Sequence, residues 1–184
     1  MASLRDNLGL LLKAAAFAAD KHRHQRRKDA DASPYINHPI ALANVLKNEG
    51  GIADVTALAA ALLHDTIEDT DATYDELESL FGKEIAAIVQ EVTDDKSLPK
   101  AERKRLQVEH ARSISHRAKL VKLADKICNL RDLLLSPPSG WENERKQAYF
   151  EWAKAVVDGL RGSNRKLESV FDALYARRGE ISTD

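Results

Sequence analysis

Apolar residues recur every three or four positions along nearly the whole chain, a spacing typical of helices that bury one face. The clearest series is Leu120, Leu123, Ile127, Leu130 and Leu134, which predicts a long helix in the core. We find no convincing segment in which apolar and polar residues alternate, as they do in a half-exposed strand. The sequence therefore predicts an all-α fold.

Helix-start and helix-stop signals divide this pattern into roughly eight to ten helices. Pro39 suits the first turn of one helix, Asp54 can cap another, and Thr73 with Glu76 forms a capping box before a third. Glycines and prolines mark breaks at Gly50-Gly51, Gly82, Pro137-Pro138 and Gly162. The expected helices cover residues 4–15, 39–50, 54–64, 73–82, 85–92, 100–111, 120–134, 149–160 and 167–174.

Length and composition indicate a single globular domain over residues 1–184. A chain of 184 residues of which 43% are hydrophobic is long and apolar enough to bury a sizeable core. The net charge of −1 excludes a general attraction to nucleic acids or anionic membranes, and no apolar stretch approaches the ~20 residues that span a bilayer. Cys128 is the single cysteine, so an intrachain disulfide is excluded. A cytoplasmic protein without a secretory signal is expected.

The segment His64-Asp65-Thr66-Ile67-Glu68-Asp69 places an imidazole beside a carboxylate, with two more carboxylates close behind. Histidine and carboxylate ligands together suit divalent cations such as Mn²⁺, Fe²⁺, Zn²⁺ or Mg²⁺. Carboxylates that do not bind the metal, here Glu68 and Asp69, can orient a water molecule or transfer protons. A His-Asp pair also arises often by chance, and the alternative is a helix-end histidine beside solvated acids. The segment is a candidate hydrolytic metal centre.

Two further residues could complete such a centre. His38 lies in a stretch stiffened by Pro34 and Pro39, and a stiff loop suits a metal ligand. Asp125 and Asn129 are four residues apart and fall opposite the apolar stripe of their helix. They form either a solvated face or one wall of a cleft, with Asp125 on the metal and Asn129 on a substrate. His38 has an alternative too, as a helix-start histidine packed on a neighbouring tyrosine.

The clearest positive patch is the run of residues 21–28, which ends in Arg27-Lys28. Arginine and lysine bind phosphates, and a guanidinium group stacks on a nucleobase. Such a run is also common as a solvated segment. Arg145 could add to the patch, while the highly charged residues 100–111 are expected to form a solvated surface helix near the cleft.

A separate histidine, a His-Asp pair and a distant aspartate in a helical chain resemble the HD-domain phosphohydrolases. The resemblance narrows to the hydrolase domain of RelA/SpoT proteins and to the small alarmone hydrolases, which include the metazoan SpoT homologues. It rests on several segments: Arg27-Lys28, Pro34-Tyr35-Ile36-Asn37-His38-Pro39, residues 61–70, residues 91–96, residues 123–132 and residues 149–153. It covers almost the whole chain and implies a single HD-domain helical bundle.

The resemblance also implies roles for individual residues. The implied metal ligands, usually for Mn²⁺, are His38, His64, Asp65 and Asp125. The implied catalytic acids are Glu68 and Asp69, and the implied contacts to a guanine nucleotide are Arg27, Lys28, Asn129 and Arg145.

The activity that the resemblance implies is hydrolysis of (p)ppGpp at the ribose 3′-position, giving GDP or GTP and pyrophosphate. The chain has no room for a synthetase domain, so degradation without synthesis is expected. Alternatives on the same site are removal of the 2′-phosphate of NADPH and another HD-type nucleotide phosphohydrolase activity. A non-catalytic alarmone-binding module is an alternative of another class, but a pure binder has no need of Glu68 and Asp69.

Overall fold

The computed structural model describes residues 4–182, which form ten α-helices, a π-helical turn and a 3₁₀ turn. The elements are α1 (Leu4–Lys21), α2 (Asn37–Asn44), η1 (Val45–Glu49), α3 (Val55–Leu63), α4 (Thr66–Asp69), α5 (Tyr74–Phe81), α6 (Lys83–Val92), α7 (Lys100–His110), α8 (His116–Leu135), α9 (Asn143–Leu160), α10 (Arg165–Ala176) and η2 (Arg177–Ser182). Within these residues the β-type pairing is one isolated bridge between Arg26 and Pro34. The prediction of an all-α fold is confirmed.

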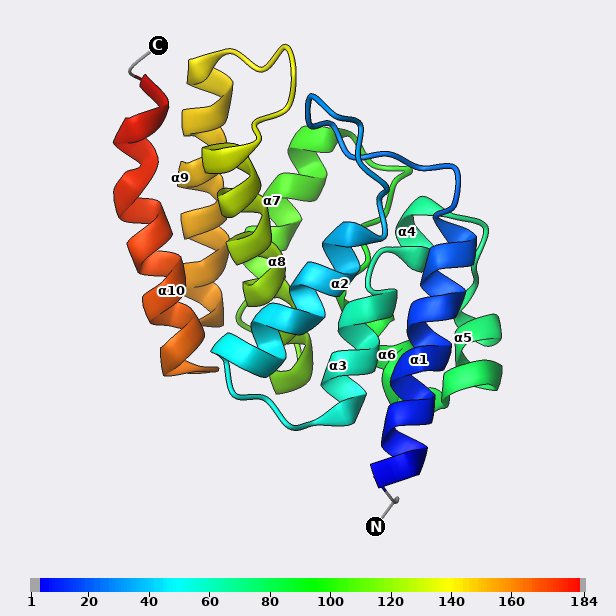
Figure 1. Ribbon diagram of the computed structural model, residues 1–184. Coiled ribbons are helices and arrows are strands. Elements are labelled where there is room, and N and C mark those ends of the chain that lie inside the picture. Colours follow the sequence, from blue (N-terminus) through cyan, green and yellow to red (C-terminus); the bar gives the residue numbers. More distant parts are fainter. Residues whose placement is uncertain (1–3, 183–184) are drawn as a thin grey trace.

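Helix α8 lies at the centre of the bundle and contacts α2, α3, α6, α9 and α10 (Figure 1). On one side of it stand α9 and α10, and on the other side α1 packs on α3 while α5 packs on α6. Fully buried side chains such as Leu42, Leu63, Leu123 and Phe150 join these layers into one continuous core. The expectation of one domain over residues 1–184 stays a prediction.

The central position of α8 follows from its sequence. Ser115 caps the helix by accepting a hydrogen bond from the N–H of Ala118 at 3.2 Å. The predicted stripe residues Leu123, Ile127 and Leu130 are fully buried. Small residues on its other faces, among them Ala124, are buried too, because neighbouring helices cover α8 on several sides. The helix ends before the two prolines, as expected.

Several helix ends differ from the predicted ones. Helix α1 continues to Lys21, and α9 begins at Asn143, well before the first apolar residue of its stripe. The second predicted helix ends in the π-helical turn η1. Gly82 separates α5 from α6 with φ +87°, a backbone conformation that L side chains rarely adopt, so the predicted break there is real.

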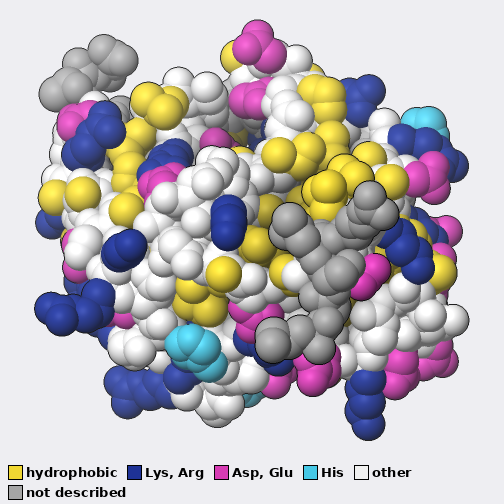
Figure 2. All heavy atoms as spheres, turned by 60° about the horizontal axis from the view of Figure 1, so that its bottom comes forward, with side chains coloured by type: hydrophobic (Ala, Val, Ile, Leu, Met, Phe, Trp, Pro, Cys, Tyr) yellow, Lys and Arg dark blue, Asp and Glu magenta, His cyan; other side chains and the backbone are white. Residues whose placement is uncertain are grey.

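Two long connections lie side by side at the top of Figure 1, residues 22–36 and residues 136–142. The N–H of Ser139 donates a hydrogen bond to the carbonyl of Lys28 at 3.1 Å and joins them. Acidic and basic side chains are interspersed over the face shown in Figure 2, in keeping with the net charge of −1. Within residues 4–182, no helix is both long enough and apolar enough to cross a membrane.

Candidate metal centre and active site

The end of α3 is what brings His64 and Asp65 together. Adjacent residues on an ideal helix point about 100° apart and do not converge on one ion. Here α3 ends at Leu63, and Asp65 has φ −101° and ψ 0°, outside the helical region. The chain then turns into the short helix α4. The interrupted backbone places Oδ2 of Asp65 2.9 Å from Nε2 of His64.

His38 completes a group of three residues, with His64 and Asp65, that could hold a metal ion. We call this group the metal cluster and the cavity around it the metal cavity. His38 lies at the start of α2, and its ring centroid is 5.2 Å from that of His64. One potential ligand atom from each of His38, His64 and Asp65 lies within 4.8 Å of the others. Both histidines are buried. Two imidazoles and a carboxylate suit a divalent transition metal.

Hydrogen bonding around His64 fits a metal ligand. Its Nδ1 lies 2.9 Å from the carbonyl oxygen of Ala61, which assigns the proton of a neutral ring to Nδ1. The lone pair on Nε2 then faces the cluster, where this buried atom has no hydrogen-bond partner, because the close contact to Asp65 lacks hydrogen-bond geometry. Burial disfavours a charged ring, but the Asp65 carboxylate outweighs it and raises the pKa of His64 to about 9. A proton and a cation therefore compete for this nitrogen.

Asp125, from α8, lies beside the three clustered residues. Its Oδ1 is 3.1 Å from Nε2 of His38 and accepts a hydrogen bond from Nδ2 of Asn129 at 2.6 Å, while Lys126 contacts Oδ2 at 3.0 Å. Burial opposes ionisation, but the Lys126 ammonium group and His38 hold the pKa of Asp125 well below its usual value. The structure thus brings the four predicted ligands together, and their role as ligands stays a prediction.

The two predicted catalytic acids lie on α4 and line the same cavity as the metal cluster. Oε2 of Glu68 accepts a hydrogen bond from the N–H of Asp94 at 3.0 Å. Burial, only partly offset by that bond, raises the pKa of Glu68 to about 7. Asp69 forms an ion pair with Lys96. One carboxyl is therefore poised to gain or lose a proton near neutral pH, and the other is neutralised by a lysine.

A second cavity, which we call the aromatic cavity, adjoins the cavity that contains the metal cluster. The two cavities share four lining residues: Arg27, Tyr35, Asp69 and Asn129. Lys28, Trp141 and Tyr149 also line the aromatic cavity. Arg27 forms an ion pair with Asp132, and its guanidinium group lies 5.7 Å from the centre of the Tyr35 ring. Three of the four predicted substrate contacts therefore border one space next to the metal cluster.

Arg145 lies in a third, neighbouring space, which we call the basic cavity. Lys100, Arg103 and Lys104 share this space with it, and Trp141 and Tyr149 line both this space and the aromatic cavity. The guanidinium of Arg145 stacks over the Trp141 ring, 4.0 Å from its centre.

Comparison with known proteins places this site in a family. The family model described as HD domain matches residues 14–153. The chain belongs to the HD-domain family. It is 61% identical over 170 residues to the Danio rerio guanosine-3′,5′-bis(diphosphate) 3′-pyrophosphohydrolase MESH1, covering 92% of this chain and 94% of the relative. The Homo sapiens MESH1 is 60% identical over 169 residues, with the same coverage of 92% and 94%.

This HD domain is also similar in structure to a solved protein. The solved protein is a metazoan ortholog of SpoT, described as hydrolysing ppGpp and playing a role in starvation responses. Its TM-score is 0.90 at 51% identity, covering 97% of this chain and 98% of that chain. The resemblance to MESH1-type HD proteins that the motifs indicated is therefore confirmed.

Tyr35 is a residue of this HD domain that the sequence analysis left without a role in the site. Its hydroxyl donates a hydrogen bond to Asp65 and lies 3.5 Å from Oδ2 of Asp69. Burial and the neighbouring acids raise the pKa of Tyr35 far above its usual value, so the hydroxyl keeps its proton. Its ring packs on His22, 4.7 Å away, and more loosely on His38. The position of Tyr35 in the proline-flanked segment next to His38 is the sequence feature that could have indicated a role in the site.

Two lysines of α8 that line the cavity were also absent from the predicted site. Lys122 and Lys126 line the metal cavity, and Lys126 is only 3% exposed, with its ammonium group 4.3 Å from the centre of the Trp152 ring. Lys122 donates a hydrogen bond to the carbonyl of Val92 at 2.9 Å. Residues 122, 125, 126 and 129 fall on one helical face, so a helical wheel drawn around Asp125 would have found both lysines.

Helix α7 is a surface helix near the cleft, as expected, and it also forms part of a cavity wall. None of its residues is fully buried, but Lys100, Arg103, Lys104 and Gln107 line the basic cavity. The indole N–H of Trp152 donates to the carbonyl of Lys104 at 3.0 Å and ties α7 to α9. The charge of this helix therefore faces a cavity as well as solvent.

Proposed function

We propose that this HD domain is a metal-dependent (p)ppGpp 3′-pyrophosphohydrolase, which converts its substrate to GDP or GTP and pyrophosphate. The observation that supports this most is the convergence of His38, His64 and Asp65 with Glu68 and Asp69 in one cavity. The activity is the one named for the MESH1 relatives, which match over more than nine-tenths of their length.

We propose that His38, His64, Asp65 and Asp125 hold one divalent cation, most simply Mn²⁺. Such a cation would lower the pKa of a water molecule in the site and would so provide the nucleophile at neutral pH. The Nε2 atom of His64, which faces the cluster, and the low pKa of Asp125 support this donor set.

The acidic pair then orients the water and moves its proton. Oε2 of Glu68 is held by the Asp94 N–H, and Oε1, which lies 3.9 Å from Nη1 of Arg103, is the oxygen that takes part in proton transfer. A carboxyl with a pKa of about 7 accepts a proton and returns it to the leaving group at neutral pH. Asp69, paired with Lys96 and next to the Tyr35 hydroxyl, orients the water.

The neighbouring cavities suit a guanine nucleotide that has phosphates on two sides of its ribose. In the aromatic cavity, Arg27 would pack on the base, Asn129 would contact the nucleoside, and Lys28 would meet phosphate. In the basic cavity, Lys100 and Arg145 would offset the charge of the second diphosphate. A small guanine nucleotide is thus the proposed partner. The buried, free Cys128 supports a reducing, cytoplasmic location.

The test is to incubate the purified protein and Mn²⁺ with ppGpp and to follow nucleotides by ion-exchange chromatography and pyrophosphate by a coupled assay. We expect GDP and pyrophosphate in equal amounts, and a loss of turnover in Glu68→Ala. Absence of pyrophosphate from protein shown by metal analysis to be loaded contradicts the proposal. NADPH is assayed in parallel, and a higher kcat/KM on NADPH than on ppGpp would favour a 2′-phosphatase instead.

A further inference from the structure

The loop between α6 and α7 contacts both members of the acidic pair. The N–H of Asp94 donates to Oε2 of Glu68 at 3.0 Å, and the ammonium group of Lys96 forms an ion pair with Asp69. The orientation of the two carboxyl groups on α4 therefore depends on where this loop lies.

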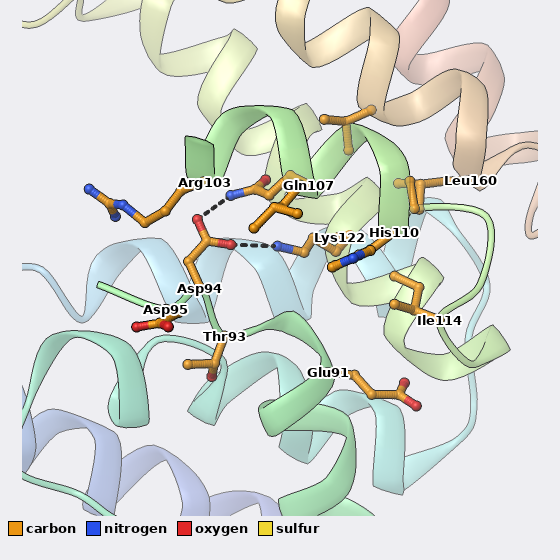
Figure 3. A pocket seen from close by; sticks show the side chains of 13 residues that line it. Glu91, Thr93, Asp94, Asp95, Arg103, Gln107, His110, Ile114, Lys122 and Leu160 are labelled. Carbon is orange, nitrogen blue, oxygen red and sulfur yellow. Dashed lines mark hydrogen bonds and ion pairs between the residues drawn. The ribbon is translucent and has the colours of Figure 1, made fainter. Parts of the chain in front are cut away.

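The side chain of Asp94 anchors that loop between two helices. Its Oδ2 accepts a hydrogen bond from Nε2 of Gln107, on α7, at 2.5 Å, and its Oδ1 lies 3.8 Å from Nζ of Lys122, on α8. Figure 3 shows the Asp94 carboxylate reaching both partners. Lys122 is itself fixed by its hydrogen bond to the carbonyl of Val92. Hydrogen bonds of this kind between charged and polar groups are stronger than neutral ones.

Helix α7 also reaches the acidic pair directly. Arg103 lies one turn before Gln107 on the same side of α7, and its Nη1 is 3.9 Å from Oε1 of Glu68. Both oxygens of Glu68 therefore face groups whose positions α7 helps to set.

We propose that Asp94 is a positioning residue: clamped by Gln107 and Lys122, it holds its own backbone N–H on Glu68 and so orients that carboxyl for proton transfer. The inference rests on the proposed function and extends it to the charged helix α7. A misplacement of a reacting group by about 1 Å costs on the order of 100-fold in rate. Loss of the clamp is expected to lower kcat while substrate binding stays intact.

The first experiment compares Asp94→Ala and Gln107→Ala with a matched control, Asp95→Ala. Asp95 is the exposed neighbour of Asp94, and its carboxylate accepts a hydrogen bond from the N–H of Ser97. We expect kcat on ppGpp to fall about 10- to 100-fold in the first two variants, with KM within about twofold of wild type. Bound Mn²⁺ and the thermal midpoint stay close to wild type, and the control keeps wild-type kcat.

A double variant tests the contact itself. Gln107→Glu alone places two carboxylates against each other and lowers kcat, whereas Asp94→Asn/Gln107→Glu restores an amide–carboxylate hydrogen bond with donor and acceptor exchanged. We expect the double variant to recover at least a tenth of wild-type kcat and to exceed Gln107→Glu. If Asp94 and Gln107 only stabilise the fold, the double variant will not regain kcat relative to Gln107→Glu when the two variants are equally stable.

Amide hydrogen exchange supplies a readout that does not depend on turnover. The N–H of residue 94 is expected to be protected in the wild type and to exchange faster in Glu68→Ala and in Gln107→Ala, but not in Asp95→Ala. Unchanged exchange, or a wild-type kcat in Asp94→Ala, overturns the inference. A wild type that does not hydrolyse ppGpp overturns the proposed function instead, while the exchange data still test the clamp.

Discussion

Glu68 shows how the environment of a single residue bears on the proposed chemistry. An exposed glutamate has a pKa near 4.3 and is ionised throughout the neutral range. Burial raises the pKa of Glu68 to about 7, against the opposing effect of the Asp94 N–H. The carboxyl is therefore largely neutral below that pH and largely ionised above it.

From this we predict the acid limb of the pH profile. Because the proposed proton acceptor must be ionised, kcat on ppGpp falls as the pH is lowered through about 7, and Glu68→Gln lowers kcat by about 10²- to 10⁴-fold. Steady-state rates between about pH 5.5 and 8.5 measure both effects. Glu78→Gln on α5 is the control and keeps the wild-type profile. A wild-type kcat that is flat across this range would show that Glu68 is not the base.

Tyr35 gives a second prediction at this scale. Tyr35→Phe keeps the ring that packs on His22 but removes the hydroxyl that bonds to Asp65. A hydrogen bond to an ionised group contributes about 1.5–3 kcal/mol, so we expect kcat to fall about 10- to 100-fold and metal affinity to weaken. Kinetics and calorimetric titration with Mn²⁺ measure these changes, and Tyr74→Phe serves as the control. Wild-type values for both would contradict a role for the hydroxyl.

At the scale of an element, α3 determines where the metal cluster forms. Nearly all of its residues are buried, and its end sets the positions of His64 and Asp65. Its start is held by Asp54, whose side chain accepts hydrogen bonds from the N–H groups of Thr56 and Ala57. Arg117, on α8, binds the same carboxylate at 2.6 Å. The side chain of Asp54 therefore both caps α3 and joins α3 to α8.

We predict that Asp54→Ala lowers the free energy of unfolding by about 1–2 kcal/mol, mostly through the lost cap, and that Asp54→Asn loses less because its amide oxygen still caps α3. Burial opposes ionisation of Asp54, but its bond to Arg117 holds its pKa below the usual value. The contribution of the charge is therefore present at neutral pH and is lost as the pH falls below about 4. Urea unfolding at several pH values measures this. Equal stability of all three proteins at pH 7 would contradict it.

Over the whole molecule, the proposed metal connects three helices that the core already holds together. The proposed ligands come from α2, the end of α3 and α8, which also pack on one another through buried apolar side chains. The fold is thus not expected to depend on the cation, unlike that of a small zinc finger.

Chelation is predicted to separate activity from folding. EDTA is expected to abolish ppGpp hydrolysis, to leave the far-UV circular dichroism unchanged at 25 °C, and to lower the thermal midpoint by about 5–10 °C, because a cation at about 100 times its Kd adds about 2.7 kcal/mol. In His38→Ala, EDTA is expected to leave the thermal midpoint unchanged. In the control His116→Ala, at an exposed histidine, EDTA is expected to lower the midpoint as in the wild type. Loss of the helical signal in EDTA would show that the metal is structural.

The local pattern of residues was enough to predict the helices and much of the candidate site. Helical periodicity depends on contacts three and four residues apart, so α8 and its buried stripe were readable directly. The ligand and acid sets came from the resemblance of short motifs, and the structure brings those side chains into one cavity. The predicted helix ends were less accurate. At α9 the first turn is polar, so the helix begins before the first residue of the apolar stripe.

The remaining features depend on how distant segments pack. The hydroxyl of Tyr35 meets Asp65 because residues 22–36 fold back over the end of α3, and no local spacing encodes that return. The same reason explains α7, whose composition is that of a solvated helix. Its packing on α9 brings Gln107 and Arg103 to Asp94 and Glu68. Local sequence sets which helices form, whereas the angles at which they pack set which polar side chains meet in the cavity.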